Sequence, residues 1–128
     1  METLCNPHIP VITIDGPSGA GKGAIASSLS ASFGWNLLNS GYIYRATAFL
    51  VKKKRMSISE ESRVLEIVRE AKFEFRSGSS GTKVICEDED ITDIIADEYH
   101  GGLASKIAIN KKIRDELVGK QRGFVKFP

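Results

Sequence analysis

A glycine-rich turn near the N-terminus constrains the fold of this chain most strongly. Residues 16–22 read Gly-Pro-Ser-Gly-Ala-Gly-Lys, and only Asp15 separates them from an apolar run at residues 11–14. A glycine, four residues and then Gly-Lys is the spacing of a phosphate-binding P-loop, which joins a strand to a helix. Glycine permits positive φ, so successive amides can face the oxygens of a phosphate at the positive end of the following helix. The pattern predicts a nucleotide-phosphate site in an α/β domain, with Lys22 facing the outer phosphates.

Composition sets the class of protein without naming a partner. The 128 residues are 41% hydrophobic and 27% charged, which is typical of one soluble globular domain. The formal charge of +2 is too small to indicate a nucleic-acid or membrane partner by itself. The only cysteines, Cys5 and Cys86, lack metal-ligand spacing, and Cys86 is expected to be a buried thiol. Without a secretory signal or a membrane-length apolar run, we expect a cytoplasmic protein.

The first part of the chain reads as a strand, helix, strand unit. Residues 10–15 and 35–38 are predicted strands. Between them Ile25, Leu29 and Phe33 recur every four residues, as on one apolar helix face. This order predicts a right-handed crossover in a parallel sheet.

The middle of the chain changes period. Polar and apolar residues alternate at 72–76, and residues 82–86 are rich in side chains that favour β-strands. Residues 77–81 are predicted to join the two strands as a five-residue hairpin loop. An antiparallel hairpin in a parallel α/β chain indicates an inserted subdomain. The acidic residues 87–90 that follow are interpreted as a solvated turn rather than a metal site.

Helices are predicted on both sides of the hairpin. Residues 39–45 are expected to be a polar turn that leads into a helix ending near residue 55, and Ser59 is the candidate N-cap of another helix. Two final helices are predicted near 102–109 and 111–125. Ile113, Leu117 and Phe124 would line one face of the last helix.

A second motif narrows the function. Residues 38–45 read Leu-Asn-Ser-Gly-Tyr-Ile-Tyr-Arg, about twenty residues after the glycine loop. The pair of motifs resembles that of the bacterial cytidylate kinases, which carry a Leu-Asp-Ser/Thr-Gly-x-x-Tyr-Arg segment at this interval. The resemblance covers the chain from about residue 10 to the C-terminus. It implies transfer of the γ-phosphate of ATP to CMP or dCMP, with Mg²⁺, by a monomer that binds neither nucleic acid nor membrane.

The resemblance also implies a fold and its division. The fold would be the three-layer α/β/α of P-loop NTPases, with a parallel sheet that is incomplete in this chain and a small inserted CMP-binding subdomain. Residues 1–9 would be a flexible lead, 10–58 the first part of the P-loop core, 59–100 the insert, and 101–128 helices that return to the core.

Roles for individual residues follow from the matching positions. Lys22 would be catalytic, and Ser40 and Arg45 would bind the acceptor nucleotide, with Arg45 gripping its phosphate. Ser105 and Arg114 match positions that contact cytosine. The residues implied to wrap the ATP phosphates are Gly16, Pro17, Ser18, Gly19, Ala20, Gly21, Lys22, Gly23 and Ala24.

Three positions depart from the family pattern. Ala24 replaces the usual threonine, Asn39 the usual aspartate and Ala96 an arginine of the insert. Each change removes a polar or charged group near the substrate phosphates, and no residue of this chain is assigned as a metal ligand. We expect weakened function from these losses.

The family pattern continues past Pro128 for roughly another hundred residues, including a third parallel strand and lid arginines. We therefore expect a truncated chain that is inactive or weakly active. Two alternatives stay open on the residues alone: a P-loop kinase for another monophosphate or small molecule, and a non-catalytic nucleotide or RNA binder.

Overall fold

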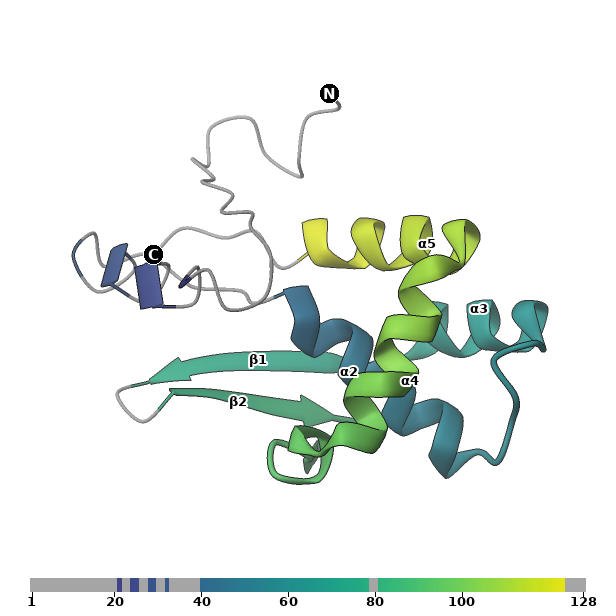
Figure 1. Cartoon of the computed structure of the whole chain (residues 1–128), viewed down its shortest axis with the longest axis horizontal. Helices are drawn as coiled ribbons and strands as arrows, with labels where there is room; N and C mark the ends of the chain where they lie inside the picture. The colour runs from purple at the N-terminus through teal and green to yellow at the C-terminus, as the bar shows by residue number, and fades with distance from the viewer. Residues whose placement is uncertain are drawn as a thin grey trace.

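The computed structural model describes residues 40–78 and 81–123, together with residues 21, 24, 25, 28, 29 and 32. Its elements are α2 (Ser40–Lys53), α3 (Glu61–Glu70), β1 (Phe73–Gly78), β2 (Gly81–Cys86), β3 (Glu89–Asp90), the 3₁₀ turn η1 (Ile94–Ala96), α4 (Glu98–Ile109) and α5 (Lys111–Arg122) (Figure 1). The predicted mixture of helices and strands is confirmed. The two predicted strands of the parallel sheet, at 10–15 and 35–38, lie outside the described residues.

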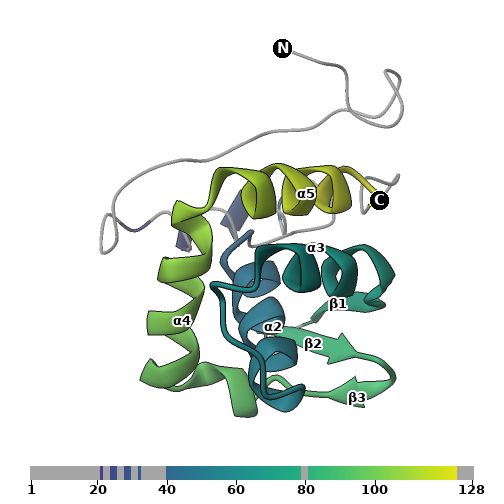
Figure 2. The same ribbon diagram turned by 90° about the vertical axis from the view of Figure 1, so that its right-hand side faces the viewer.

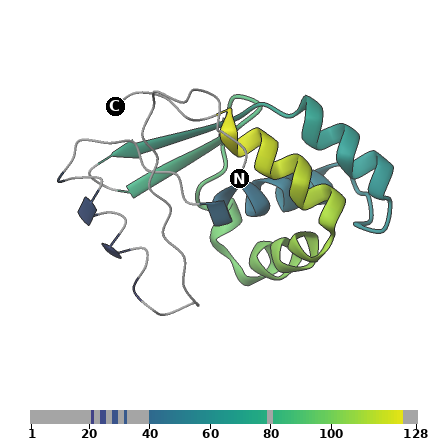
Figure 3. The same cartoon turned by 90° about the horizontal axis from the view of Figure 1, so that it is seen from above.

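The predicted hairpin is confirmed, but its loop is shorter than expected. β1 and β2 pair antiparallel from Phe73 opposite Cys86 to Gly78 opposite Gly81, which leaves only residues 79–80 between the strands. Gly81 has a φ of 110°, so a residue with a side chain would be strained where the second strand begins. The hairpin extends away from the helices (Figure 3).

The turn predicted at the acidic residues 87–90 is confirmed for Glu87 and Asp88, whereas Glu89 and Asp90 form a strand. Glu87 and Asp88 both have positive φ, and the chain then returns along β2 as the short strand β3 (Figure 2). All four residues of the run are exposed. Cys86, just before the turn, is buried as expected, and burial raises the pKa of its thiol to about 11.

Helix α2 is the central helix of the described part, because it contacts α3, α4, α5, η1 and β2. In Figure 2 it lies between the small sheet and α4. The expectation that residues 39–45 form a turn was wrong, because the helix already begins at Ser40. Ile43, Ala46 and Leu50 repeat at helical spacing and are almost fully buried, so the apolar face of α2 includes part of the segment predicted to be a turn.

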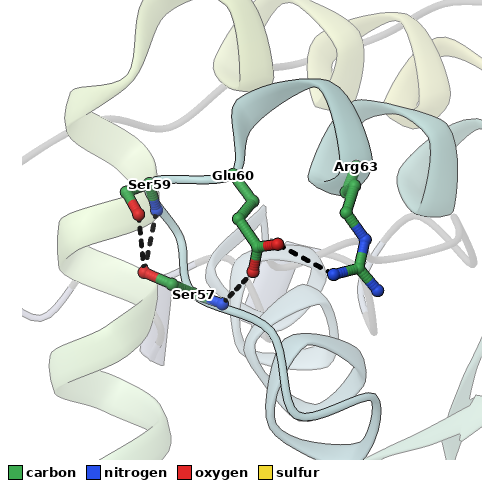
Figure 4. Close-up of polar contacts among 4 residues, drawn as sticks. All are labelled: Ser57, Ser59, Glu60 and Arg63. Atoms are coloured by element: carbon green, nitrogen blue, oxygen red, sulfur yellow. Dashed lines mark hydrogen bonds and ion pairs between the residues drawn. The ribbon is translucent and has the colours of Figure 1, made fainter.

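The start of α3 also differs from the prediction. The helix begins at Glu61 with Glu60 at the N-cap position, where no side chain caps the helix. Ser59, the predicted cap, instead shares a hydrogen bond with the hydroxyl of Ser57 at 2.8 Å. The carboxylate of Glu60 accepts from the Ser57 amide at 2.7 Å and from Arg63 at 2.8 Å (Figure 4). The serines therefore shape the preceding turn rather than the helix end.

The last two helices are confirmed, and each begins at a side-chain cap. Asp97 accepts from the His100 amide at 2.9 Å, so α4 starts at Glu98, four residues earlier than predicted. Asn110 ends α4 and caps α5 by accepting from the Ile113 amide at 3.0 Å. Ile113 and Leu117 are fully buried on α5, as predicted, while Phe124 lies outside the described residues.

A single apolar cluster joins these elements. It contains buried residues from α2, α3, β1, β2, η1, α4 and α5, for example Ile43, Val64, Val84, Ile107 and Ile113. The helices and the small sheet therefore hold one another in place. None of the described helices is long and apolar enough to cross a membrane.

Candidate functional site

The candidate site centres on Arg45, which joins α2 to the start of α4. Its Nη1 atom donates to the carbonyl of Ile95 at 2.6 Å and to the carbonyl of Asp97 at 3.0 Å. These acceptors lie in η1 and at the N-cap of α4, respectively. The guanidinium is therefore held by backbone groups that lie 50 and 52 residues further along the chain.

A glycine of α4 allows this close approach. A Cβ atom at Gly101 would lie 2.7 Å from Nη2 of Arg45 and 3.2 Å from its Cζ. A separation of 2.7 Å is too short for a carbon and a nitrogen that are not bonded, so the guanidinium could not stay in place beside any larger residue. The neighbouring Gly102 has nothing within 4 Å of the same position. Only the first of the two glycines is needed for Arg45.

No carboxylate of the described residues balances the charge of Arg45. Within residues 40–78 and 81–123 it forms no ion pair, and the two bonds of Nη1 are its only hydrogen bonds. The guanidinium carries five N–H donors, so its Nε and Nη2 donors stay unused in the described part of the chain. A half-buried arginine in this state presents positive charge and a planar donor edge, which match a phosphate or carboxylate.

Asp97 and His100 fix the backbone that holds Arg45. Oδ1 of Asp97 accepts from the backbone amide of His100 and lies 2.7 Å from Nδ1 of the same residue. These contacts, the backbone bond first, lower the pKa of the Asp97 carboxyl below its ordinary value. His100 is fully buried and stacks on Phe49 of α2 with ring centroids 6.5 Å apart. Its Nε2 atom is buried and has no hydrogen-bond partner in the described part of the chain.

The predicted cytosine-contacting residues lie near this centre. Ser105 lies one helical turn after Gly101, and its hydroxyl donates to the Gly101 carbonyl at 3.1 Å. Arg114 of α5 is exposed and donates to the Ala108 carbonyl at 3.2 Å. The pKa of Tyr44, the residue before Arg45, is raised chiefly by burial, while the charge of Arg114 lowers it. Helices α2, α4 and α5 therefore bring Arg45, Ser105 and Arg114 to one region of the protein.

The glycine loop is described only in part. Gly16 to Ala20, Lys22 and Gly23 lie outside the described residues, and so does the side chain of Ser40, the first residue of α2. Gly21 has a φ of 86°, in the left-handed region that glycine favours. Ala24 is helical and exposed, and Ile25 is 53% exposed although its spacing predicted an apolar face. Among the described residues no group of His, Cys, Asp or Glu is arranged to hold a metal ion.

Sequence reasoning missed Gly101, Asp97 and His100. Two signals were available. A Gly-Gly pair inside a helix costs helix stability and so indicates a packing requirement, and an aspartate just before a helical segment is an N-cap candidate. The carbonyls of Ile95 and Asp97 have no sequence signature, because every residue has a carbonyl.

Comparison with known proteins establishes the family. The sequence model of the family described as "Cytidylate kinase" matches residues 12–128. The chain is 44% identical over 116 residues to a cytidylate kinase of Colwellia psychrerythraea. The matched region covers 90% of this chain and 51% of the relative. It is 40% identical over 125 residues to one of Pseudomonas aeruginosa, covering 96% of this chain and 55% of the relative. A cytidylate kinase of Methylococcus capsulatus is 42% identical over 120 residues, with 94% and 54% covered.

The chain belongs to the cytidylate kinase family. It spans about half the length of the curated relatives that it matches.

Proposed function

We propose that this protein takes part in the transfer of the γ-phosphate of ATP to CMP or dCMP. Family membership supports the reaction class. The observation that carries the proposal is the state of Arg45, which is held in place by neutral carbonyls while its charge and its remaining donors have no partner among the described residues. A guanidinium in this state fits the phosphate of an acceptor nucleotide.

The proposed roles of the chain's residues follow the chemistry of phosphoryl transfer. An oxygen of the CMP phosphate attacks the γ-phosphorus of ATP, the bond to the bridging oxygen breaks, and ADP leaves. Catalysis of this kind depends on positioning and on stabilising charge. Arg45 would reduce the repulsion between the two phosphate groups, and Lys22 with residues 16–24 would hold the donor. Ser105 and Arg114 would read the cytosine edge.

The described residues do not fit a protein-held Mg²⁺ ion. Ala24 has a methyl group where a hydroxyl could serve as a ligand, and the described part of the chain holds no cluster of metal-binding side chains. We propose that the ion comes with the ATP phosphates. A cytoplasmic location and a monomeric state remain predictions of the sequence.

Titration of the chain with CMP, UMP and AMP tests the choice of acceptor. We expect CMP to bind more tightly than UMP and AMP, because Ser105 and Arg114 would distinguish the base. Equal affinities would favour a kinase for another acceptor. Binding of RNA with a steep salt dependence, without binding of CMP, would favour a non-catalytic RNA binder.

Turnover tests the donor site. Replacement of Lys22 by Met should reduce ADP formation in the presence of CMP by roughly a hundredfold or more, because a cation at the transferring group stabilises the transition state. Unchanged turnover would remove Lys22 from its proposed role.

A further inference from the structure

We propose that Gly101, together with the carbonyls of Ile95 and Asp97, is a positioning device for Arg45. It would fix the guanidinium with its unused donor edge available to the acceptor phosphate. This inference rests on the proposed function, because it assigns the phosphate as the ligand of Arg45. It adds residues that do not contact the nucleotide themselves.

The hydrogen bonds of Arg45 use one nitrogen of the guanidinium. Nη1 has two hydrogens, and the carbonyls of Ile95 and Asp97 accept both, at 2.6 and 3.0 Å. The Nε hydrogen and those of Nη2 have no acceptor in the part of the chain that the structure describes. Nε and Nη2 form one side of the planar group, and this side can donate two parallel bonds to a phosphate. The carbonyls therefore determine which edge of the guanidinium is available.

The Arg45 guanidinium packs closely against Gly101. The guanidinium lies against the backbone of α4, where a Cβ at Gly101 would be 2.7 Å from Nη2. Arg45 is the flexible partner in this contact, so a larger residue at position 101 would displace the guanidinium rather than the helix. The donor edge would then lose its fixed direction.

Holding a long side chain in one conformation costs conformational entropy. A free arginine samples many rotamers, and a ligand that binds it must restrict them. In this protein the restriction is already made by backbone carbonyls before a ligand arrives. Such preorganisation strengthens binding without adding a contact to the ligand.

Gly101→Ala and Gly102→Ala are a matched pair that isolates this effect. Both substitutions replace a glycine with alanine in the same helix, but only the first would meet Arg45. We expect Gly101→Ala to weaken CMP binding by about tenfold, and Gly102→Ala to change it less than about twofold. Cytidine, which lacks the phosphate, should bind both variants equally well. Isothermal titration of the 128-residue chain measures these affinities.

The same substitutions made in the Arg45→Ala variant separate this inference from the proposed function. With Arg45→Ala present, Gly101→Ala should have no further effect on CMP affinity. Equal CMP affinities for the Gly101→Ala and Gly102→Ala variants would overturn the positioning role. An equal loss of CMP and cytidine affinity in Gly101→Ala would also overturn it, because the effect would then not involve the phosphate.

Thermal melts test the device even where CMP does not bind. Alanine favours a helix over glycine, so Gly102→Ala should raise the melting temperature. Gly101→Ala should raise it less, because it displaces Arg45, and the two should become equal when Arg45 is alanine. Failure of CMP to bind the unaltered chain would overturn the proposed function. Equal melting shifts in both backgrounds would overturn the device.

Discussion

The α3–α5 contact and the α2–α4 contact hold helices together in different ways. α3 and α5 bury Val64, Val68, Ile113 and Leu117 in the common core. Outside that core, Arg69 pairs with Glu116 at 2.8 Å. Glu61 accepts from Asn110 at 2.7 Å and lies 3.7 Å from Lys112. The charged groups that link these two helices therefore meet partners of opposite charge or a neutral amide.

The α2–α4 contact contains a charge that has no such partner among residues 40–78 and 81–123. Arg45 binds only backbone carbonyls in the described part of the chain, and Phe49 stacks on the buried His100. The carbonyls satisfy two donors of Arg45 but carry no net charge, so its positive charge is not compensated within the described part of the chain. The α3–α5 contact is therefore one of matched partners, whereas the α2–α4 contact contains the cation that we propose binds the acceptor phosphate.

The largest expected effect on stability is in the α3–α5 contact. Leu117→Ala should lower the free energy of unfolding by about 2–5 kcal/mol, because it leaves a cavity at a fully buried position. Chemical denaturation followed by circular dichroism measures the change. Ile109→Ala is the control, because Ile109 is 79% exposed and its replacement should cost less than about 0.5 kcal/mol. Similar costs for the two variants would contradict the described core.

Two arginine substitutions compare the contacts directly. Arg45→Ala should lower the free energy of unfolding by about 1–2 kcal/mol, because two carbonyls lose a charged donor, and should weaken CMP binding at least tenfold. Arg69→Ala removes an exposed pair and should cost less than about 1 kcal/mol, with CMP binding unchanged. The comparison fails if Arg69→Ala weakens CMP binding as much as Arg45→Ala does.

Asp97 offers a pH-dependent test with a smaller effect. Its pKa is lowered in the folded chain, chiefly by the His100 amide, so the carboxylate stabilises the fold above the pKa that it has when unfolded. This contribution should be lost as the pH falls through the lowered pKa, below about pH 4. The melting temperature should therefore fall more between pH 7 and pH 3 for the unaltered chain than for Asp97→Asn. Identical pH profiles would show that the carboxylate charge does not support the N-terminus of α4.

The smallest expected effect is the coupling between Arg69 and Glu116. A double-mutant cycle with alanine at both positions should give about 0.2–1 kcal/mol, because the Arg69 side chain is 61% exposed and the pair is open to solvent on that side. The coupling should shrink in 1 M salt, where screening is strong. A coupling above about 2 kcal/mol that is insensitive to salt would mean that this pair, too, is shielded from water.

The sequence predicted the elements whose signal is local. Alternation at residues 72–76 and the apolar spacing of Ile113 and Leu117 predicted the hairpin and the buried face of α5 correctly. Ser59 was wrongly predicted as a cap. Several polar residues lie near the start of α3, and the hydroxyl and the amide of Ser59 both bond to the Ser57 hydroxyl instead of capping the helix. The start of α2 was missed because Ser40 and Gly41 resemble a turn, while Ile43 and Ala46 belong to the core.

The sequence predicted the charged side chain of the candidate site but not the groups that hold it. The motif at residues 38–45 singled out Arg45 and its proposed ligand. Its protein partners could not be predicted, because they are carbonyls 50 and 52 positions away in sequence or, for Gly101, the absence of a side chain. Contacts of this kind depend on how the helices cross, which no local pattern specifies.

The most direct test of the account is the side-chain NMR signal of Arg45. The central claim is that its Nε and Nη2 donors are available to an acceptor phosphate while Nη1 stays bound to the carbonyls of Ile95 and Asp97. The Arg45 Nε–H resonance, assigned by comparison with the Arg45→Ala variant, should shift on addition of CMP and stay unchanged with cytidine. CMP that binds the chain without moving this resonance, or cytidine that moves it equally, would contradict the claim.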